Sequence, residues 1–332
     1  MNRAGRPRIE IGLNAAIVAV RDQQPLILVV VNEGEPGDGP RGDGLPFGPF
    51  DPLQHRTFEA GLRAWVAEQT ALKLGYVEQL YTFGDRGRHT APGDSGPHLV
   101  SVGYLALTRA TEESTDALTR SGAVWRGWYE FFPWEDWREG RPAILDRTLL
   151  PALKRWAAAE SRARPDPRPL GRLERIRLAF GEGGAIWDEE RVLDRYELLY
   201  GAGVLVEAGR DGREISDQRA AQRAGVAMRF DHRRILATAI SRLRAKLKYR
   251  PVVFELMPEA FTLTELQRTV EAISGRHLHK QNFRRLVEGA ALVEPTGDST
   301  QRGRGRPAAL FQFRREVLKE RPAPGFRFSA RG

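Results

Sequence analysis

A short segment near the end of the chain concentrates side chains that can bind nucleic acid. Its polar residues are His279, Lys280, Gln281, Asn282, Arg284 and Arg285. Lysine, arginine, asparagine and glutamine donate hydrogen bonds to base edges in a major groove, and the cations also neutralise the phosphates beside it. The segment therefore predicts contacts with double-stranded DNA, provided that the fold presents these side chains on one surface.

A second basic segment follows the first. Arg302, Arg304 and Arg306 alternate with glycines and precede Pro307. This Arg-Gly-Arg strip resembles the core of an AT-hook, which fits a narrow minor groove because the negative potential there attracts guanidinium groups. The alternative for both segments is a solvated helix face beside a flexible basic loop.

The spacing of apolar residues predicts the elements that position these groups. Thr262 and Glu265 form a Thr-x-x-Glu capping box at the start of one helix, and Ser274 with Gly275 ends it. A second helix directs apolar residues inward and leaves the polar ones outside; the inward residues are Leu278, Leu286, Val287 and Ala290. Two strands, residues 291–294 and 308–313, then enclose a basic tip.

Residues 254–313 therefore have the layout of a winged helix-turn-helix domain. Thr262 and Thr264, at the start of the first helix, are further candidates for DNA contacts. The charge distribution supports this interpretation: from Met228 onward there are 22 basic and 10 acidic residues, whereas the rest of the chain has 30 and 33. The C-terminal part thus has the basic charge of a phosphate-binding module, whereas basic and acidic residues nearly balance in the rest of the chain.

Composition narrows the remaining possibilities. A length of 332 residues indicates about two domains. The chain has no cysteine, which excludes disulfides, thiolate metal sites and cysteine catalysis, and its six histidines show no metal-ligand spacing. The longest apolar runs, such as residues 26–31, have the length of strands. We therefore expect a soluble cytoplasmic protein without a membrane segment or a bound metal.

The first half alternates predicted strands with one strong helix. Strands are expected at residues 11–20, 26–31, 77–83, 99–108 and 124–129, with a hairpin joining the first two. A helix is expected from Thr57 to Leu74, with Gly75 as its stop, and others at residues 149–162 and 189–200. Residues 164–169 suggest a linker, and residues 201–227 give no clear pattern. A long helix capped by Asp231 and running to Arg250 joins the two halves.

The order of strands, Leu-Pro-Phe-Gly loop and helix resembles a Nudix domain. That family places carboxylates three and four residues apart on the helix, where they converge on Mg²⁺ beside a nucleoside diphosphate. Arg63 and Glu68 match the motif, but Ala64 and Ala67 replace two of its carboxylates and Thr70 replaces its glycine. A single carboxylate holds a divalent cation poorly, so we expect no catalytic residue and no enzyme; an ion pair between Arg63 and Glu68 is the plain alternative.

Residues 8–110 and 229–313 resemble Nudix-related transcriptional regulators of NAD metabolism, and the chain length is similar to the alphaproteobacterial NadQ branch. The resemblance implies an α+β fold: an α/β/α Nudix-like sandwich at residues 1–160, a linker and helical insert at 161–230, and a linker helix with a winged helix-turn-helix at 231–320. It implies an effector site for NAD, ADP-ribose or ATP, with no required cofactor. The candidate residues are Arg63, Glu68, Tyr81, Phe83, Arg86, Arg88 and Tyr104. Core packing is the alternative for the aromatics, and a solvated loop for Arg86 and Arg88.

The resemblance further implies a homodimeric repressor of NAD biosynthesis or salvage genes that binds a palindromic operator. Two other functions remain open. A Nudix-type nucleoside-diphosphate hydrolase with an accessory nucleic-acid-binding domain would need other carboxylates, for example Glu59 or Asp85. A non-specific nucleic-acid binder would bind scrambled DNA equally well and would depend steeply on salt.

Overall fold

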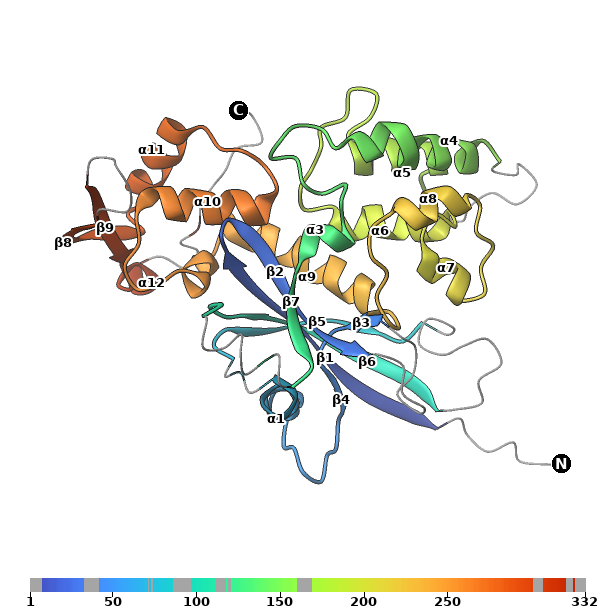
Figure 1. Ribbon diagram of the computed structural model, residues 1–332, viewed down its shortest axis with the longest axis horizontal. Helices are drawn as coiled ribbons and strands as arrows, with labels where there is room; N and C mark the ends of the chain where they lie inside the picture. Colours follow the sequence, from blue (N-terminus) through green and yellow to red (C-terminus); the bar gives the residue numbers. More distant parts are fainter. Residues whose placement is uncertain are drawn as a thin grey trace.

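The computed structural model describes residues 8–32, 42–70, 72, 74–85, 97–111, 118, 121–159, 169–300, 307–320 and 325. A mixed β-sheet with helices on both faces forms the centre of the molecule. A group of inserted helices lies at one end and a helical domain with a two-stranded hairpin lies at the other (Figure 1).

The central sheet has seven strands. Their bounds are β1 Ile9–Arg21, β2 Gln24–Asn32, β3 Gly42–Gly44, β4 Phe47–Pro49, β5 Val77–Phe83, β6 His98–Leu107 and β7 Ala123–Gly127. The main order is β3-β2-β1-β6-β5, while β4 pairs with β1 and β7 pairs with β2. Among the strands that the structure describes, only β1 and β6 pair in parallel, from Ile9 opposite His98 to Val18 opposite Leu107. The predicted β1–β2 hairpin is confirmed and turns at Asp22 and Gln23, which both have positive φ.

Two helices cover opposite faces of this sheet. Alternate β1 residues, Leu13 and Ile17 among them, pack with Leu62 of α1 (Phe58–Thr70). The intervening residues, such as Val18, pack with Ile235 of α9 (His232–Leu247). This alternation follows from the two-residue period of a strand. The predicted α/β/α sandwich is confirmed, and the helix expected to join the two halves forms one of its layers.

Some predicted boundaries were wrong. Helix α1 ends at Thr70 rather than Leu74, because the Thr70 hydroxyl donates to the Val66 carbonyl and accepts from the Leu72 amide, replacing helical bonds. The last strand of the sheet ends at Gly127, and Trp128–Phe131 forms the short helix α3 instead. At the start of α9, Asp231 occupies the N-cap position but its side chain makes no capping hydrogen bond.

The insert consists of short helices. They are the π-helix η1 Leu145–Leu149, α4 Leu150–Ala158, α5 Arg172–Phe180, α6 Val192–Gly201, α7 Val206–Arg210 and α8 Gln218–Arg223. Helix α6 begins three residues later than the sequence predicts, and α7 and α8 occupy the region without a clear pattern. Most of the predicted linker, residues 164–168, lies outside the described residues. Helix α6 packs on both α5 and α9, which fastens the insert to the sandwich.

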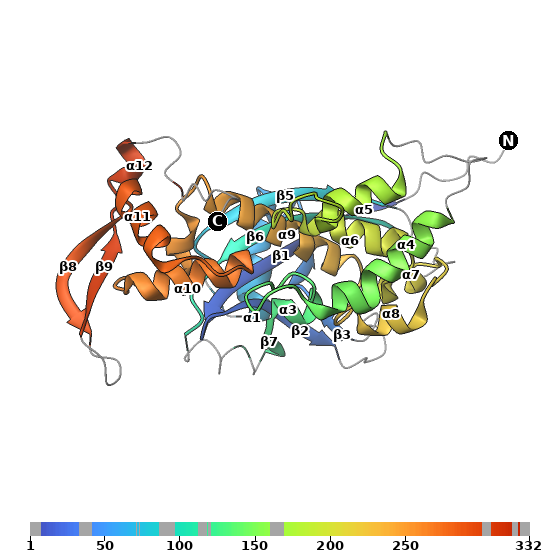
Figure 2. The same ribbon diagram turned by 90° about the horizontal axis from the view of Figure 1, so that it is seen from above.

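The C-terminal domain has the predicted order of helix, turn, helix and wing. Its elements are the 3₁₀ helix η2 Val252–Leu256, α10 Leu263–Ser274, α11 Lys280–Ala290, β8 Val293–Thr300, β9 Ala308–Phe313 and α12 Val317–Glu320 (Figure 2). Phe254 stacks on Phe313 with ring centroids 4.3 Å apart, and Phe261 bridges to Phe311. These contacts close the hairpin onto the base of the two helices.

No helix among the described residues combines the length and the apolar character needed to span a membrane.

Candidate nucleic-acid interface and nucleotide site

Helix α11 presents a continuous polar face to solvent. Its exposed residues include Lys280, Gln281, Asn282, Arg284 and Arg285, while Phe283 and Val287 are buried. The outward orientation of the predicted residues is confirmed. Within the part of the chain that the structure describes, none of the three cations forms an ion pair. The face can therefore donate to base edges and phosphates without first breaking such a pair.

The turn before α11 is fixed by side chains of α10. Glu271, which is mostly buried, accepts a hydrogen bond from the Leu278 amide at 2.8 Å, and Gln267 donates to the Leu278 carbonyl at 2.8 Å. His279 occupies the N-cap position of α11, is exposed and makes no capping hydrogen bond. Helix α11 is therefore oriented by contacts to α10 rather than by a capping hydrogen bond of its own.

The two threonines at the start of α10 differ in accessibility. The Thr262 hydroxyl accepts from the Glu265 amide at 3.1 Å, and the Glu265 carboxylate accepts from the Thr262 amide at 2.8 Å, so the predicted capping box is confirmed. Thr262 is only 9% exposed, whereas Thr264 is exposed. Thr264 is thus the threonine of this pair whose side chain a phosphate can reach.

The wing is longer than the sequence predicts. Strand β8 continues to Thr300, which pairs with Ala308, and the register shifts between Pro295 and Ser299. Because proline cannot donate a ladder hydrogen bond, this irregularity lets the strand resume beyond Pro295. The arginines of the predicted strip, Arg302, Arg304 and Arg306, lie outside the described residues, between the ends of β8 and β9.

A groove of about 580 Å³ lies between the sheet and the winged domain, and the sequence did not reveal it. Asp22 and Gln23 of the β1–β2 turn line one side, and Thr264 and Arg268 of α10 line the other. Arg138 anchors this turn by donating to the Gln23 carbonyl at 2.7 Å. The tip of the sheet hairpin therefore lies beside the helix that precedes the recognition helix.

Arg63, one of the two residues that match the Nudix motif, has structural partners on and after α1, whereas Glu68 is exposed. Arg63 pairs with Glu59 at 2.9 Å and donates to the carbonyls of Leu74 and Gly75 at 2.6 and 3.2 Å. The alternative of an Arg63–Glu68 pair was wrong, because residues five apart point in directions about 140° apart on a helix. Arg63 instead holds the segment that follows α1 against the helix.

The carboxylates near this helix do not form a cation site. Glu59 and Glu68 are nine residues apart, so they project from nearly opposite sides of α1. Asp85 is bound by Arg234. Among the described residues, no three histidine, aspartate or glutamate side chains converge on one point.

The other predicted effector residues divide between the two faces of the sheet. Phe83 is buried on the α9 face, where the Arg234 guanidinium lies 5.2 Å from the centre of its ring. Tyr81 is 56% exposed and lines a groove of about 360 Å³ beside α6 and α9. Arg86 and Arg88 follow Asp85 in the sequence and lie outside the described residues.

Tyr104 lies on the opposite face, with α1. Its hydroxyl donates to Gln79 at 3.3 Å, and burial, followed by the nearby charge of Glu59, raises the pKa of Tyr104. The structure therefore brings Tyr104 near Arg63 and Glu59, but it separates these residues from Phe83 and Tyr81. A single pocket cannot contain the whole predicted set.

Two buried polar side chains on the α9 face are better placed for a ligand. Asn14 and Ser101 are 0% and 1% exposed, and none of their side-chain polar atoms has a hydrogen-bond partner among the described residues. Ser101 pairs with Gly12 of β1 and with Phe83 of β5, so it lies diagonally beside Asn14. The signal in the sequence was one asparagine within the apolar run of residues 13–20.

Aromatic rings surround this polar pair. The Phe47 ring occupies the space above Gly12, where an added Cβ would lie 2.3 Å from it. Phe230 and His232 lie 6.4 and 6.0 Å from the Phe47 ring, and His232 accepts a hydrogen bond from the Leu45 amide at 3.0 Å. Buried polar groups without partners cost free energy, so their presence beneath aromatic rings favours a planar, hydrogen-bonding ligand.

The fold defines a class of protein: a Nudix-like sandwich that carries a winged helix domain with an exposed basic helix. Residues 253–313 match the family model of the NrtR DNA-binding winged helix domain. A curated relative, the ADPR responsive transcriptional repressor NtrR of Acinetobacter baylyi, is 44% identical over 84 residues, which are 25% of this chain and 33% of the relative. The chain thus spans about a third of the length of that relative.

Two solved structures share the architecture of the whole chain. One is Shewanella oneidensis NrtR complexed with a 27mer DNA, with a TM-score of 0.53 and 22% identity over 93% of this chain and 95% of that one. The other is Shewanella oneidensis NrtR, with a TM-score of 0.53 and 21% identity over 92% and 95%. Residues 253–313 are therefore a winged helix domain of the NrtR type, and the chain has the fold of an NrtR protein. The expected fold class is confirmed, while the assignment to the NadQ branch stays a prediction.

Proposed function

We propose that this protein is a DNA-binding transcriptional regulator that represses genes of NAD biosynthesis or salvage. The observation that carries the proposal is the NrtR-type winged helix, whose recognition helix α11 exposes Lys280, Arg284 and Arg285. The similar structure of Shewanella oneidensis NrtR was solved with DNA, and the Acinetobacter relative is named a repressor. We further propose a homodimer on a palindromic operator, because two-fold symmetry in the protein favours a two-fold site.

The effector we propose is an adenine nucleotide, with ADP-ribose first because the Acinetobacter relative is named ADPR responsive. The proposed site is the α9 face of the sheet around Asn14 and Ser101, with Phe83 and Tyr81 toward its edge. Arg86 and Arg88 follow Asp85 in the chain and would meet the diphosphate. We leave three of the expected residues out of this site, because Tyr104 lies on the opposite face of the sheet, Arg63 binds Glu59 and Glu68 is exposed on α1.

The Nudix-like domain is proposed to bind its nucleotide without hydrolysing it. Glu59 is paired with Arg63, and Asp85 with Arg234, so an arginine already binds each of the two carboxylates considered as replacements for those of the motif. Mg²⁺-dependent hydrolysis of a nucleoside diphosphate requires several carboxylate oxygens that converge on one point, because they must bind the cation.

A gel-shift titration on DNA from promoters of NAD-biosynthesis genes tests the proposed function. We expect a shift that survives excess scrambled competitor and changes when ADP-ribose is added, with NAD and ATP as comparisons. Equal affinity for scrambled DNA would instead support a non-specific binder. Rapid conversion of ADP-ribose to AMP and ribose 5-phosphate with Mg²⁺ would instead support a hydrolase.

Replacing Asn14 by leucine tests the nucleotide site. Leucine has a similar volume and needs no hydrogen bond, so the free protein should gain about 1–3 kcal/mol in its free energy of unfolding. The dissociation constant for ADP-ribose, measured by calorimetry, should rise at the same time. Ala19→Ser, which adds a hydroxyl elsewhere on β1, serves as the control for changes in this strand; a lower stability with unchanged ADP-ribose affinity in Asn14→Leu would remove Asn14 from the site.

A further inference from the structure

The C-terminal end of α10 is held by groups from outside the winged domain. The Tyr129 hydroxyl donates to the Ala272 carbonyl at 2.7 Å, and the Trp137 amide donates to the Gly275 carbonyl at 2.8 Å. Arg244 of α9 donates from Nε to the Ile273 carbonyl at 2.9 Å. The last carbonyls of a helix lack intrahelical partners, so these three donors satisfy positions that would otherwise need water.

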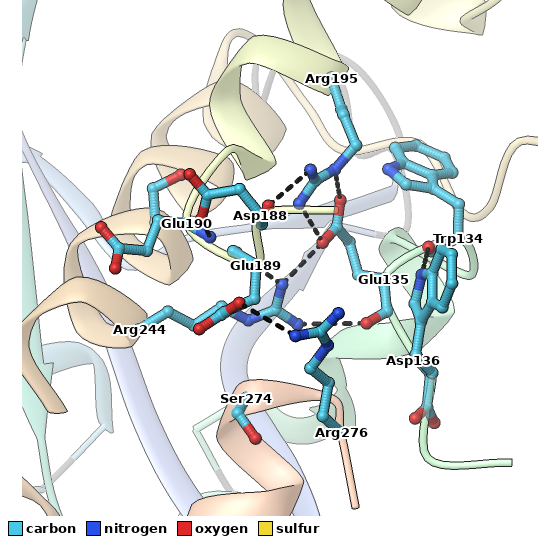
Figure 3. Close-up of polar contacts among 12 residues, drawn as sticks. Trp134, Glu135, Asp136, Asp188, Glu189, Glu190, Arg195, Arg244, Ser274 and Arg276 are labelled. Atoms are coloured by element: carbon cyan, nitrogen blue, oxygen red, sulfur yellow. Dashed lines mark hydrogen bonds and ion pairs between the residues drawn. The ribbon is translucent and has the colours of Figure 1, made fainter. Parts of the chain in front are cut away.

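Arg244 also joins this helix end to a buried carboxylate (Figure 3). It donates to Glu135 at 2.7 Å, and Arg195 of the inserted helix α6 binds both oxygens of the same carboxylate at 2.6 and 2.8 Å. Arg195 and Arg244 are 0% and 1% exposed, and Glu135 is 1% exposed. Burial alone would raise the pKa of Glu135, but the charges of Arg195 and Arg244 outweigh it and lower the pKa below its ordinary value. Glu135 therefore stays ionised while both arginines bind it.

Arg195 reaches beyond this carboxylate into the insert. It donates to the carbonyls of Ala179, at the end of α5, and Asp188 at 2.8 and 2.9 Å. Its guanidinium carbon lies 3.9 Å from the centre of the Trp187 ring. One side chain thus connects α5, α6 and the α5–α6 loop to the carboxylate that orients Arg244.

The end of α10 is packed closely against the segment that contains Glu135. Gly275 has φ of +72°, and an added Cβ would lie 2.4 Å from the Glu135 carbonyl oxygen. Interactions of charged groups that are buried and fully hydrogen-bonded depend strongly on geometry, because a displaced charge would lose partners that water cannot replace. The contact between α10 and the sandwich is therefore specific in distance and orientation.

We propose that Arg195 is a positioning residue for DNA binding: the inserted helices at residues 169–230 fix the orientation of the winged helix through Arg195, Glu135 and Arg244. The inference rests on the proposed DNA-binding function and gives the insert its role. The insert contributes no predicted DNA contact; it acts through the end of α10, which in turn holds the turn before α11. Loss of Arg195 would remove two of the hydrogen bonds that fix the Glu135 carboxylate, so Glu135 would orient Arg244 less firmly and α10 could tilt.

Hydrogen exchange and DNA titration of the full-length chain test this proposal together. In Arg195→Met, amides of residues 271–279 should exchange faster than in the wild type, and operator affinity should fall by about 2- to 30-fold. Calorimetric affinity for ADP-ribose should be unchanged. Arg177→Met removes an exposed arginine of α5 in the same insert and should change neither readout.

A second variant covers the case in which Arg195→Met fails to fold. Tyr129→Phe removes only the hydroxyl that caps Ala272, and it should produce a smaller change in the same direction in both readouts. If the wild type binds its operator and both variants retain wild-type exchange and affinity, the proposal is overturned. If the wild type does not bind operator DNA, the proposed function fails, while the exchange of residues 271–279 still decides whether Arg195 holds the winged helix.

Discussion

Helices α11 and α1 have similar lengths and one buried face each, yet they use their charged residues in different ways. The cations of α11 project into solvent without an ion pair to a described residue. The arginine of α1, Arg63, binds Glu59 and two backbone carbonyls of its own domain. The difference indicates that the charges of α11 are available to a binding partner, whereas Arg63 of α1 stabilises the fold.

Helix α1 also shows that its packing in the sandwich does not depend on its exposed face. Leu62 and Val66 remain buried against β1, and Trp65 donates to the Pro49 carbonyl at 2.7 Å. Ala64 and Ala67 are exposed at the positions of the missing carboxylates. The packing of α1 depends on its buried face, whereas metal ligands would project from its exposed face. Substitutions on the exposed face can therefore remove metal ligands with little change in stability.

The largest expected effect comes from removing the charges of α11. Substitution of Lys280, Arg284 and Arg285 by alanine should weaken operator binding by about 1–3 kcal/mol for each side chain that contacts a base. Fluorescence anisotropy with labelled operator DNA measures this loss. Thermal stability should remain close to that of the wild type, because all three side chains are exposed.

Arg147→Ala provides the matched control for that triple variant. Arg147 is an exposed arginine of η1, which directly precedes α4, and α4 lies at the opposite end of the molecule from α11 (Figure 1). Its loss should leave operator affinity unchanged apart from a small salt-dependent component. If the control weakened binding as much as each α11 substitution, binding would depend on total charge rather than on this face.

A smaller effect is expected at the matching arginine of α1. Arg63→Ala removes the hydrogen bonds to the Leu74 and Gly75 carbonyls, so the free energy of unfolding should fall by about 1–2 kcal/mol. Urea denaturation measures this change. Operator affinity of the folded variant should match the wild type; a selective loss of DNA binding with unchanged stability would contradict the structural role of Arg63.

The stability contributed by the buried cluster of Glu135, Arg195 and Arg244 should also depend on pH. Because the folded-state pKa of Glu135 lies below its ordinary value of 4.5, its ionised form stabilises the fold above that pH, and this contribution is lost as the pH falls through the folded pKa. Arg195 and Arg244 face the carboxylate, and the Tyr129 hydroxyl accepts a hydrogen bond from Arg244. The difference in unfolding free energy between wild type and Glu135→Gln, about 3–5 kcal/mol at neutral pH, should therefore shrink below pH 4.5. A difference independent of pH would exclude this contribution.

The smallest effect is expected at Glu68. The side chain is exposed on α1 and lies on the side opposite to Glu59, so Glu68→Ala should change stability by less than about 0.5 kcal/mol. Formation of AMP from ADP-ribose with Mg²⁺ should be at background before and after the substitution. Turnover that disappears in Glu68→Ala would show that α1 retains its chemistry.

The sequence predicted the two regions unequally well. The capping box of Thr262 and Glu265, Gly275 at the end of α10 and the outward face of α11 depend on local spacing, and the structure has all of them. The nucleotide site depends on which strand residues share a face, and this alternation separated Tyr104 from Phe83. Strand pairing across the chain brings Ser101 beside Asn14, which no local pattern could have indicated.

The cluster of Glu135, Arg195 and Arg244 was not predicted for the same reason, because no local pattern connects its residues. Glu135, Arg195 and Arg244 lie far apart in the sequence and come from three different segments. Buried arginines look like surface residues in a helical pattern, because their burial depends on a partner that the pattern does not contain. The role of the insert therefore emerged only from its contacts.

Operator affinity measured with and without saturating ADP-ribose tests the central claim most directly. If one chain couples nucleotide binding in the sandwich to DNA binding through α11, ADP-ribose should change the operator dissociation constant by about 5- to 150-fold. Operator DNA should then change the affinity for ADP-ribose by the same factor. An operator affinity that is identical at zero and saturating ADP-ribose would contradict the account, because the two regions would then act independently.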